Sequence, residues 1–545
     1  CDILAPVDQG FTSLFVSPGA WFSGTTKSTF PEALSMNIVR VVVLLLLPSW
    51  VFAADRPNIL FIFTDDQSHR TVSCYTEAYE WVKTPNIDRL ARQGVRFTHA
   101  YMGTWCMSSR ATMLTGHHQY GVRSMRMEGE YPGSAYDPKK CPFWPSIFRR
   151  EGYHTAQIGK WHTGIDTGFG RDWDYQVVWN RPRHPANAGS YYEDQLIEIN
   201  GKPAAKVAGY TTDWYTDRAD EYIRGKHRDK RKSWYLWLCY GAVHGPYTPA
   251  ERHRGAYAGA RVPVPEDVFP GRSGKPEYVR KRDTWVRGKG GLPELNPSRK
   301  LRTVKNMPLF GNSLAGWVRQ YHQGVLAIDD AVGRLLKTLR ETGQDRNTLV
   351  VFAADQGIAW GQHGFQQKVA PYDANIRGPL IMSFPGVIPP GGVCPSPVGG
   401  TDLPPTFFGF AGLELPWKMH GHDLAPLLKK PGRNWEHPAL TILTGQSFGA
   451  DADRVPVDPA KLYATAKVPW WVSLAKGRHK YIRTLIEGEI EELYDLENDP
   501  EELRNLALEP VHRKRLRAMR AAAIAELRRT DAVMADFLPA VGTPE

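Results

Sequence analysis

The sequence predicts an α/β fold: a large, mostly parallel sheet flanked by helices, followed by a smaller C-terminal α+β subdomain. Apolar runs of strand length alternate with segments of helical periodicity through most of the chain, a pattern typical of sheets with helices on both faces. Polar side chains follow several of these runs directly, at the carboxyl ends of strands where ligands bind in such sheets. After about residue 420 the runs become short and closely spaced, which favours antiparallel strands.

The composition is that of a globular protein with a basic charge balance. The chain has 545 residues, of which 42% are hydrophobic and 23% charged, and its formal net charge is +11. An excess of positive charge favours anionic partners: nucleic acid, anionic lipid, or sulfated and carboxylated polymers. The net charge alone does not distinguish among these three classes of partner.

Residues 36–54 have the pattern of a secretory signal peptide. Met36 and Arg40 precede a short apolar run at 41–47, and small residues suited to signal peptidase lie within 51–53. We therefore expect export to the periplasm or the extracellular space, although a buried helix is the alternative. The apolar run is too short for a stable membrane span. Residues 1–35 begin with Cys rather than Met and show no clear periodicity, so we expect them to be a non-native upstream extension.

The first strand is the continuous apolar run at 57–63, suited to the centre of a parallel sheet. It ends in Asp65 and Asp66. An adjacent pair of carboxylates is either a solvated turn or, since two such charges need a cation to share them, a metal site. A helix at 84–94 and a strand at 95–97 follow.

The next segment, 103–116, combines a thiol with a cation. Cys106 precedes Arg110 by four residues, so the two share one face if this segment is helical. Backbone N–H groups at such a helix start point at an anion. The alternatives are a buried thiol with a surface Arg, or a cysteine phosphatase, whose loop places Arg six residues after Cys. That position is Thr112 here.

Two further strands end in polar residues. A helix at 143–150 precedes the strand at 154–158, after which Lys160 and His162 point the same way if the strand persists. The strand at 234–240 leads to His244. Lys160 and His162 could instead be surface residues. His244 could instead be a capping or core histidine. The basic cluster 224–232 is interpreted as a solvated surface.

The second half repeats the pattern. Residues 250–312 are irregular and basic, and their bases could hold an anionic polymer near the cleft. An amphipathic helix at 316–341 precedes the strand 348–354, which ends in Asp355 and Gln356. A strand at 379–384 follows. Short strands at 472–474, 480–482 and 492–494 and a helix at 510–529 complete the chain, so we expect a catalytic domain at 55–420 and the subdomain at 421–545.

Together these motifs resemble type I sulfatases of the alkaline phosphatase-like superfamily. Residues 106–116 resemble the signature Cys-x-Pro-Ser-Arg-x-x-x-Leu-Thr-Gly, with Ser108 where Pro is usual. The ending Leu-Tyr-Asp-Leu-Glu-Asn-Asp-Pro at 493–500 resembles the C-terminal segment of the family. The resemblance runs from about residue 57 to residue 505.

The resemblance implies a mechanism and its residues. A maturation enzyme would oxidise Cys106 to Cα-formylglycine, whose hydrate would be the nucleophile. A divalent cation, Ca²⁺ in preference to Mg²⁺, would be held by oxygen ligands from Asp65, Asp66, Asp355 and Gln356. His244 would protonate the leaving alcohol or bind its bridging oxygen. The other side chains would bind the diol and the sulfate: Arg110, Lys160, His162 and Lys368.

The resemblance thus predicts a secreted sulfatase acting on a sulfated carbohydrate, with no nucleic-acid partner. A phosphodiesterase or phosphonate monoester hydrolase of the same superfamily is the first alternative. An inactive homologue that binds sulfated glycans, because Ser108 blocks maturation, is the second.

Overall fold

The computed structural model describes residues 56–122, 125–126, 135–136, 138–139, 142–298, 312–445, 455–464 and 467–540, together with Gly24. The predicted signal peptide at 36–54 lies outside these residues, as does nearly all of 1–35. Asp55–Glu545 form one compact unit. None of the helices among the described residues is long and apolar enough to cross a membrane.

A mixed sheet of 11 strands, in the described part of the chain, forms the centre of this unit. Its middle strands, in the order β12-β1-β9-β5-β6, are parallel, whereas β13 and β7 on either side of them are antiparallel. The predicted large and mostly parallel sheet is therefore confirmed. The strands are β1 (Asn58–Thr64), β2 (Val95–Tyr101), β5 (His154–Trp161), β6 (Tyr175–Asn180), β7 (Leu196–Ile199), β8 (Ala205–Lys206), β9 (Trp234–Cys239), β12 (Thr348–Ala354), β13 (Gly378–Ser383), β14 (Gly392–Cys394) and β15 (Val398–Gly399).

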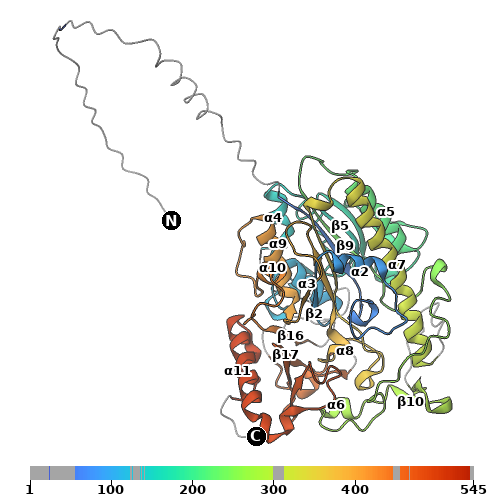
Figure 1. The fold of residues 1–545 in the computed structure, drawn as a ribbon, viewed down its shortest axis with the longest axis vertical. Coiled ribbons are helices and arrows are strands. Elements are labelled where there is room, and N and C mark those ends of the chain that lie inside the picture. The colour runs from blue at the N-terminus through green and yellow to red at the C-terminus, as the bar shows by residue number, and fades with distance from the viewer. Residues whose placement is uncertain are drawn as a thin grey trace, which may run out of the picture. The chain divides into compact units, whose positions relative to one another are not determined.

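Helices cover both faces of the sheet (Figure 1). Alternate residues of β1 show why: Leu60 and Ile62 belong to one buried apolar cluster, and Phe61 and Phe63 to another. The first cluster includes α2 (Pro85–Arg92), α5 (Thr211–Ile223) and α7 (Leu314–Glu341). The second includes α3 (Cys106–Thr115), α4 (Pro145–Arg150), α9 (Leu403–Ala411) and α10 (Ala425–Lys429).

A small antiparallel sheet follows, as the sequence predicts. It has the order β16-β17-β18-β19, and α11 (Arg513–Arg529) packs on it (Figure 1). Its strands are β16 (Ala439–Leu443), β17 (Trp471–Lys476), β18 (His479–Thr484) and β19 (Glu491–Asp495). The predicted helix at 510–529 begins later, at Arg513, because Pro510–His512 is a 3-10 turn.

The segment 250–312, predicted to be irregular, contains short elements where it is described. These are α6 (Glu277–Arg280), β10 (Trp285–Arg287) and β11 (Pro293–Leu295). Of its bases, Arg282 is buried over the Phe365 ring, with 4.3 Å between the guanidinium carbon and the ring centroid. Lys281 pairs with Glu277, and 299–311 lie outside the described residues. The chain also contains β3 (Met125–Arg126), β4 (Ala135–Tyr136) and α8 (Asp373–Ile376).

Candidate active site

The carboxyl edge of the large sheet gathers the predicted residues. Parallel strands bring their carboxyl ends to one edge, so the residues after β1, β12 and β9 meet although they are far apart in the chain. The Asp66 backbone N–H donates to Asp355 Oδ1 at 2.9 Å. Asp66 adopts a left-handed backbone with φ 53°, which Asp tolerates better than most residues. His244 Nε2 lies 3.6 Å from Asp66 Oδ2.

Helix α3 begins at Cys106 and points its first turn at this edge. It ends at Gly116, which has φ 73°; a Cβ there would lie 2.6 Å from Met419 Sδ, so the turn favours glycine. The Cys106 thiol donates to Asp65 Oδ1 at 3.2 Å, and Lys368 Nζ lies 2.9 Å from Cys106 Sγ. The thiol is therefore in contact with both a carboxylate and an ammonium group.

Two buried cations neutralise Asp65. Arg110 Nη2 lies 3.2 Å from Asp65 Oδ2 and 3.3 Å from Asp355 Oδ2, and Lys160 pairs with Asp65. Burial alone would raise the pKa of the Asp65 carboxyl, but Lys160 and Arg110 outweigh it and hold that pKa well below its usual range. The residue before Lys160 is Gly159, which has φ 110°; a Cβ there would lie 1.9 Å from the Cys239 carbonyl oxygen, so only glycine fits at this position of β5.

Lys368 and Gln356 surround Asp66. Lys368 Nζ lies 2.6 Å from Asp66 Oδ1 and 4.7 Å from the centroid of the Trp105 ring. Burial would lower the pKa of Lys368, but the Asp66 carboxylate outweighs it and raises that pKa. The Gln356 amide nitrogen donates to Asp66, and its oxygen accepts from Ser109 Oγ at 3.1 Å.

The two histidines differ in their surroundings. His244 Nδ1 lies 2.8 Å from the Gly245 carbonyl oxygen; because a carbonyl only accepts, Nδ1 carries the proton and Nε2 faces Asp66. The His162 ring lies 3.0 Å from Arg181 Nη1. Burial, followed by Arg181 and Lys160, lowers the pKa of His162 well below its usual value, so His162 is a neutral ring beside the cationic cluster.

The sequence analysis missed two residues of this site. The Tyr191 ring stacks on His244, with 3.9 Å between centroids and 2° between planes, and its hydroxyl lies 3.4 Å from Lys160 Nζ. The Arg181 guanidinium lies over the same tyrosine ring at 5.0 Å. Both residues come from the polar, aromatic region 165–232, where no periodicity identifies them.

The site contains a group of side chains that could hold a metal ion. Asp65, Asp66, Cys106 and His244 each offer a ligand atom within 4.8 Å of one another, and of these the two carboxylates are the oxygen donors that a hard divalent cation takes. Asp355 adjoins this group, and burial together with the Asp65 charge raises the pKa of its carboxyl to about 7. The protein therefore does not fully neutralise the charge of this third buried carboxylate. A bound cation would supply the missing positive charge. For Gln356 to offer its oxygen, its amide group would have to rotate.

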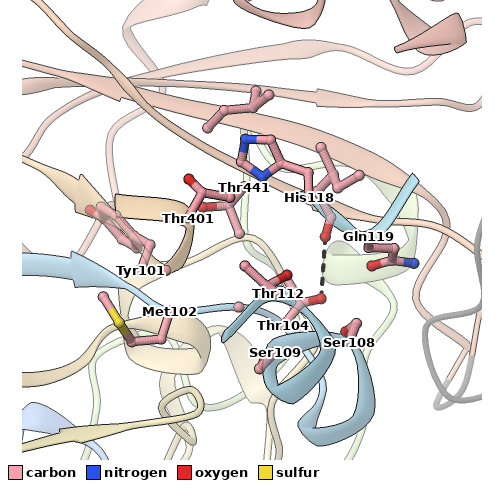
Figure 2. A pocket seen from close by; sticks show the side chains of 14 residues that line it. Tyr101, Met102, Thr104, Ser108, Ser109, Thr112, His118, Gln119, Thr401 and Thr441 are labelled. Carbon is pink, nitrogen blue, oxygen red and sulfur yellow. Dashed lines mark hydrogen bonds between the residues drawn. The ribbon is translucent and has the colours of Figure 1, made fainter. Parts of the chain in front are cut away.

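Polar side chains of α3 also line a small pocket (Figure 2). Ser108, Ser109 and Thr112 line a pocket of about 30 Å³ together with residues of β16 and the turn at 400–402, which is room for one water. Ser108 Oγ donates to the Trp105 carbonyl oxygen at 3.0 Å. Thr104 Oγ1 donates to the Ile442 carbonyl oxygen at 3.2 Å. The small sheet thus supports the helix that begins at Cys106.

Comparison with known families decides the identity. A family model described as Sulfatase matches residues 57–413. The chain belongs to the sulfatase family. The predicted family is thereby confirmed, and with it the prediction that this sulfatase is a sulfuric ester hydrolase.

Curated relatives and solved structures agree with this assignment. The sulfatase is 29% identical to an N-acetylglucosamine-6-O-sulfatase of Bacteroides thetaiotaomicron over 83% of this chain and 82% of the relative. It is 26% identical to human N-acetylglucosamine-6-sulfatase over 72% of this chain and 68% of the relative. A structure solved with its substrate D-glucosamine-2-N,6-O-disulfate superposes with a TM-score of 0.71 and 25% identity, over 88% of this chain and 98% of that chain.

A phosphonate monoester hydrolase from Silicibacter pomeroyi has the same fold, with a TM-score of 0.66 and 22% identity over 87% of this chain and 96% of that one.

Proposed function

We propose that this sulfatase removes 6-O-sulfate groups from glucosamine residues of sulfated carbohydrates, through a formylglycine formed from Cys106. The observation that carries the proposal is the cluster of Arg110, Lys160 and Lys368 around Cys106 and the carboxylates, at the edge where sulfate would bind. The names of two relatives and the sugar in the related structure support the choice of substrate. The basic net charge of +11 agrees with an anionic substrate.

Each residue has a proposed part in the reaction. Arg110 and Lys160 hold the nucleophile and one side of the sulfate, while Lys368 neutralises the sulfate oxygens; such fixed positive charge stabilises charge that develops in the transition state. His162 assists the nucleophile as a neutral ring. His244 would bind the bridging oxygen or protonate the leaving alcohol through Nε2 once that nitrogen takes up a proton, and Tyr191 stacks on its ring.

Two groups complete the proposed site. Asp65, Asp66, Asp355 and Gln356 would hold a divalent cation, Ca²⁺ in preference to Mg²⁺, which polarises the sulfate oxygens when bound. The formylglycine hydrate supplies one hydroxyl to attack sulfur and a second to release the sulfate. We propose that the protein is exported, as the signal pattern at 36–54 indicates, and that a maturation enzyme oxidises Cys106.

Mass spectrometry of the peptide containing Cys106, from a host with maturation enzymes, tests the mechanism. We expect a mass loss of about 18 Da relative to the thiol, because –CH₂SH becomes –CHO. The Cys106→Ala variant should retain its melting temperature and lose sulfate release from D-glucosamine 6-sulfate. A fully active enzyme with an unmodified thiol would contradict the mechanism, and release from other sugar sulfates alone would contradict the substrate.

A phosphonate monoester hydrolase or phosphodiesterase is the second candidate, because one neighbour in fold is named as a phosphonate monoester hydrolase. The ratio of kcat/KM for an aryl sulfate to that for an aryl phosphate diester separates the two. We expect the sulfate ester to be the better substrate.

An inactive protein that binds sulfated glycans is the third candidate, because Ser108 stands where Pro is usual in the motif. It predicts glycan binding that survives Cys106→Ala, with no sulfate release from the wild-type protein. Conversion of Cys106 in the wild-type chain would exclude it.

A further inference from the structure

A second pocket lies at the opposite edge of the large sheet. It has a volume of about 410 Å³, within the range of roughly 300–1,000 Å³ found for ligand pockets. Asn58, Ser233 and Asn347 line it. These residues lie at the amino ends of β1, β9 and β12, the strands whose carboxyl ends lead to the catalytic edge. The six residues of β9, at about 3.3 Å each, separate the two edges by roughly 20 Å.

The lining of this pocket is strongly basic. Arg224 pairs with Asp220 at 3.1 Å and with Glu341 at 2.7 Å, and Arg231 pairs with Asp229 at 2.9 Å. The described part of the chain places no carboxylate within 4.0 Å of the other cationic groups. We call the whole lining the basic pocket; its cationic residues are Arg224, Arg228, Lys230, Arg231 and Lys232.

The segment 224–232 is folded against the protein. The Arg228 guanidinium donates to the Tyr222 and Ile223 carbonyl oxygens at 2.9 Å and 3.0 Å, and to Gln344 Oε1 at 3.0 Å. A Cβ at Gly225 would lie 2.2 Å from Lys230 Cε, so Lys230 lies across this glycine. Most of these side chains are exposed, as the interpretation of a solvated surface expects, and this surface is concave.

The chemistry of the lining favours a sulfated sugar over other anions. Five cationic side chains line one concave site, which fits a ligand carrying several negative charges, and a sulfated sugar is the anion that the proposed function supplies. A concave site does not match a flat lipid surface. The neutral side chains are Asn58, Ser233, Thr342, Gln344 and Asn347.

We propose that the basic pocket is a non-catalytic binding site for a sulfated polysaccharide. The choice of this class of ligand rests on the proposed function. A polymer held there raises the effective concentration of its other sulfated sugars at the catalytic edge of the same molecule. The pocket acts on polymer affinity and leaves the chemistry of small substrates unchanged.

The test removes the two unpaired lysines. Lys230 and Lys232 are exposed, so Lys230→Ala/Lys232→Ala leaves the core intact. We expect the Kd of a fluorescent, size-defined sulfated hexosamine–uronate oligosaccharide to rise roughly 5- to 30-fold at low salt, since each exposed charge pair contributes about 0.5–1 kcal/mol. The difference should shrink at high salt, and kcat/KM for an aryl sulfate should not change.

A second double variant controls for net charge. Lys202 and Lys430 are also exposed and lie outside the basic pocket, so Lys202→Ala/Lys430→Ala removes the same charge elsewhere. An equal loss of affinity in this control, or no loss in the pocket variant, would overturn the proposal. So would equally tight, lysine-dependent binding of a DNA oligonucleotide or of phosphatidylserine vesicles, because the pocket would then be a general anion surface.

Binding is measured in the Cys106→Ala background, where no turnover is expected. If the wild-type enzyme releases no sulfate from sugars while the pocket variant still loses affinity, the proposed function fails and the pocket assignment stands. If the enzyme releases sulfate and the pocket variant binds normally, the pocket assignment alone fails.

Discussion

Asp65 and Asp355 are both fully buried at the carboxyl edge of the large sheet, yet the pKa values of their carboxyls shift in opposite directions. Asp65 contacts Arg110 and Lys160, which hold its pKa low against the effect of burial. Asp355 shares the Arg110 guanidinium with Asp65. Burial together with the Asp65 charge raises the pKa of the Asp355 carboxyl to about 7. The cations are thus placed asymmetrically: Lys368 lies 2.6 Å from Asp66, and Asp355 is the carboxylate that needs a further positive charge.

Removal of divalent cations should therefore lower stability and activity together. We expect EDTA to lower the melting temperature and Ca²⁺ to restore it; a cation at 100 times its Kd contributes about 2.7 kcal/mol. In Asp355→Asn this response should shrink, because one oxygen charge is gone. Differential scanning fluorimetry with and without Ca²⁺ measures the melting temperatures of the wild type and of Asp355→Asn. A wild-type melting temperature that does not change with EDTA would argue against the cation.

At the scale of elements, the segment that carries Lys368 depends on the small sheet. Val369 has a left-handed backbone with φ 75°, which costs energy for a β-branched residue. The Trp471 indole on β17 donates to the Val369 carbonyl oxygen at 2.8 Å. A strand of the small sheet thus fixes the backbone next to a proposed catalytic lysine.

The Trp471→Phe variant should lose activity more than stability. It removes this hydrogen bond and keeps an aromatic ring, so we expect kcat to fall about 10- to 100-fold as Lys368 shifts. Trp470→Phe is the matched control, because the neighbouring Trp470 indole donates to the Gly445 carbonyl oxygen at 3.0 Å instead. Steady-state kinetics on an aryl sulfate compares them; equal effects would mean that Trp471 has no positioning role.

At the scale of the whole unit, buried charges join the two sheets. Lys480 on β18 lies 2.7 Å from Asp373 Oδ1 and 2.8 Å from Glu502 Oε1, and the Tyr101 hydroxyl at the end of β2 donates to the same aspartate at 2.9 Å. Burial raises the pKa of the Glu502 carboxyl to about 7, although Lys480 opposes the shift. Buried ion pairs therefore connect the small sheet to the large one.

The Lys480→Met variant should destabilise the whole unit. It removes the nearest cation from two buried carboxylates, Asp373 and Glu502, which costs about 3–5 kcal/mol. Arg478→Met is the control: its side chain is 44% exposed beside Asp495, so the loss should stay below about 1 kcal/mol. Urea unfolding followed by tryptophan fluorescence measures both, and a Lys480→Met midpoint equal to that of the control would contradict this account.

Much of the fold could be predicted because its signals are local. The run 348–354 is apolar throughout and is β12 as predicted, and the periodicity of 316–341 identifies α7 to within two residues at its start. Residues after such strands could be placed at one edge by the rule for parallel sheets. The segment 250–312 lacked these signals, because its short elements depend on packing with distant residues such as Phe365.

Contiguous segments of the chain carried the signals for the family, the large sheet and the residues that follow its strands, because periodicity and short motifs are local. Three features became visible only in the folded chain: Tyr191 stacks on His244, Trp471 donates a hydrogen bond to the backbone beside Lys368, and the cations of 224–232 line a pocket. Each of these depends on contacts between residues far apart in the chain. Such contacts follow from packing and leave no local pattern in the sequence.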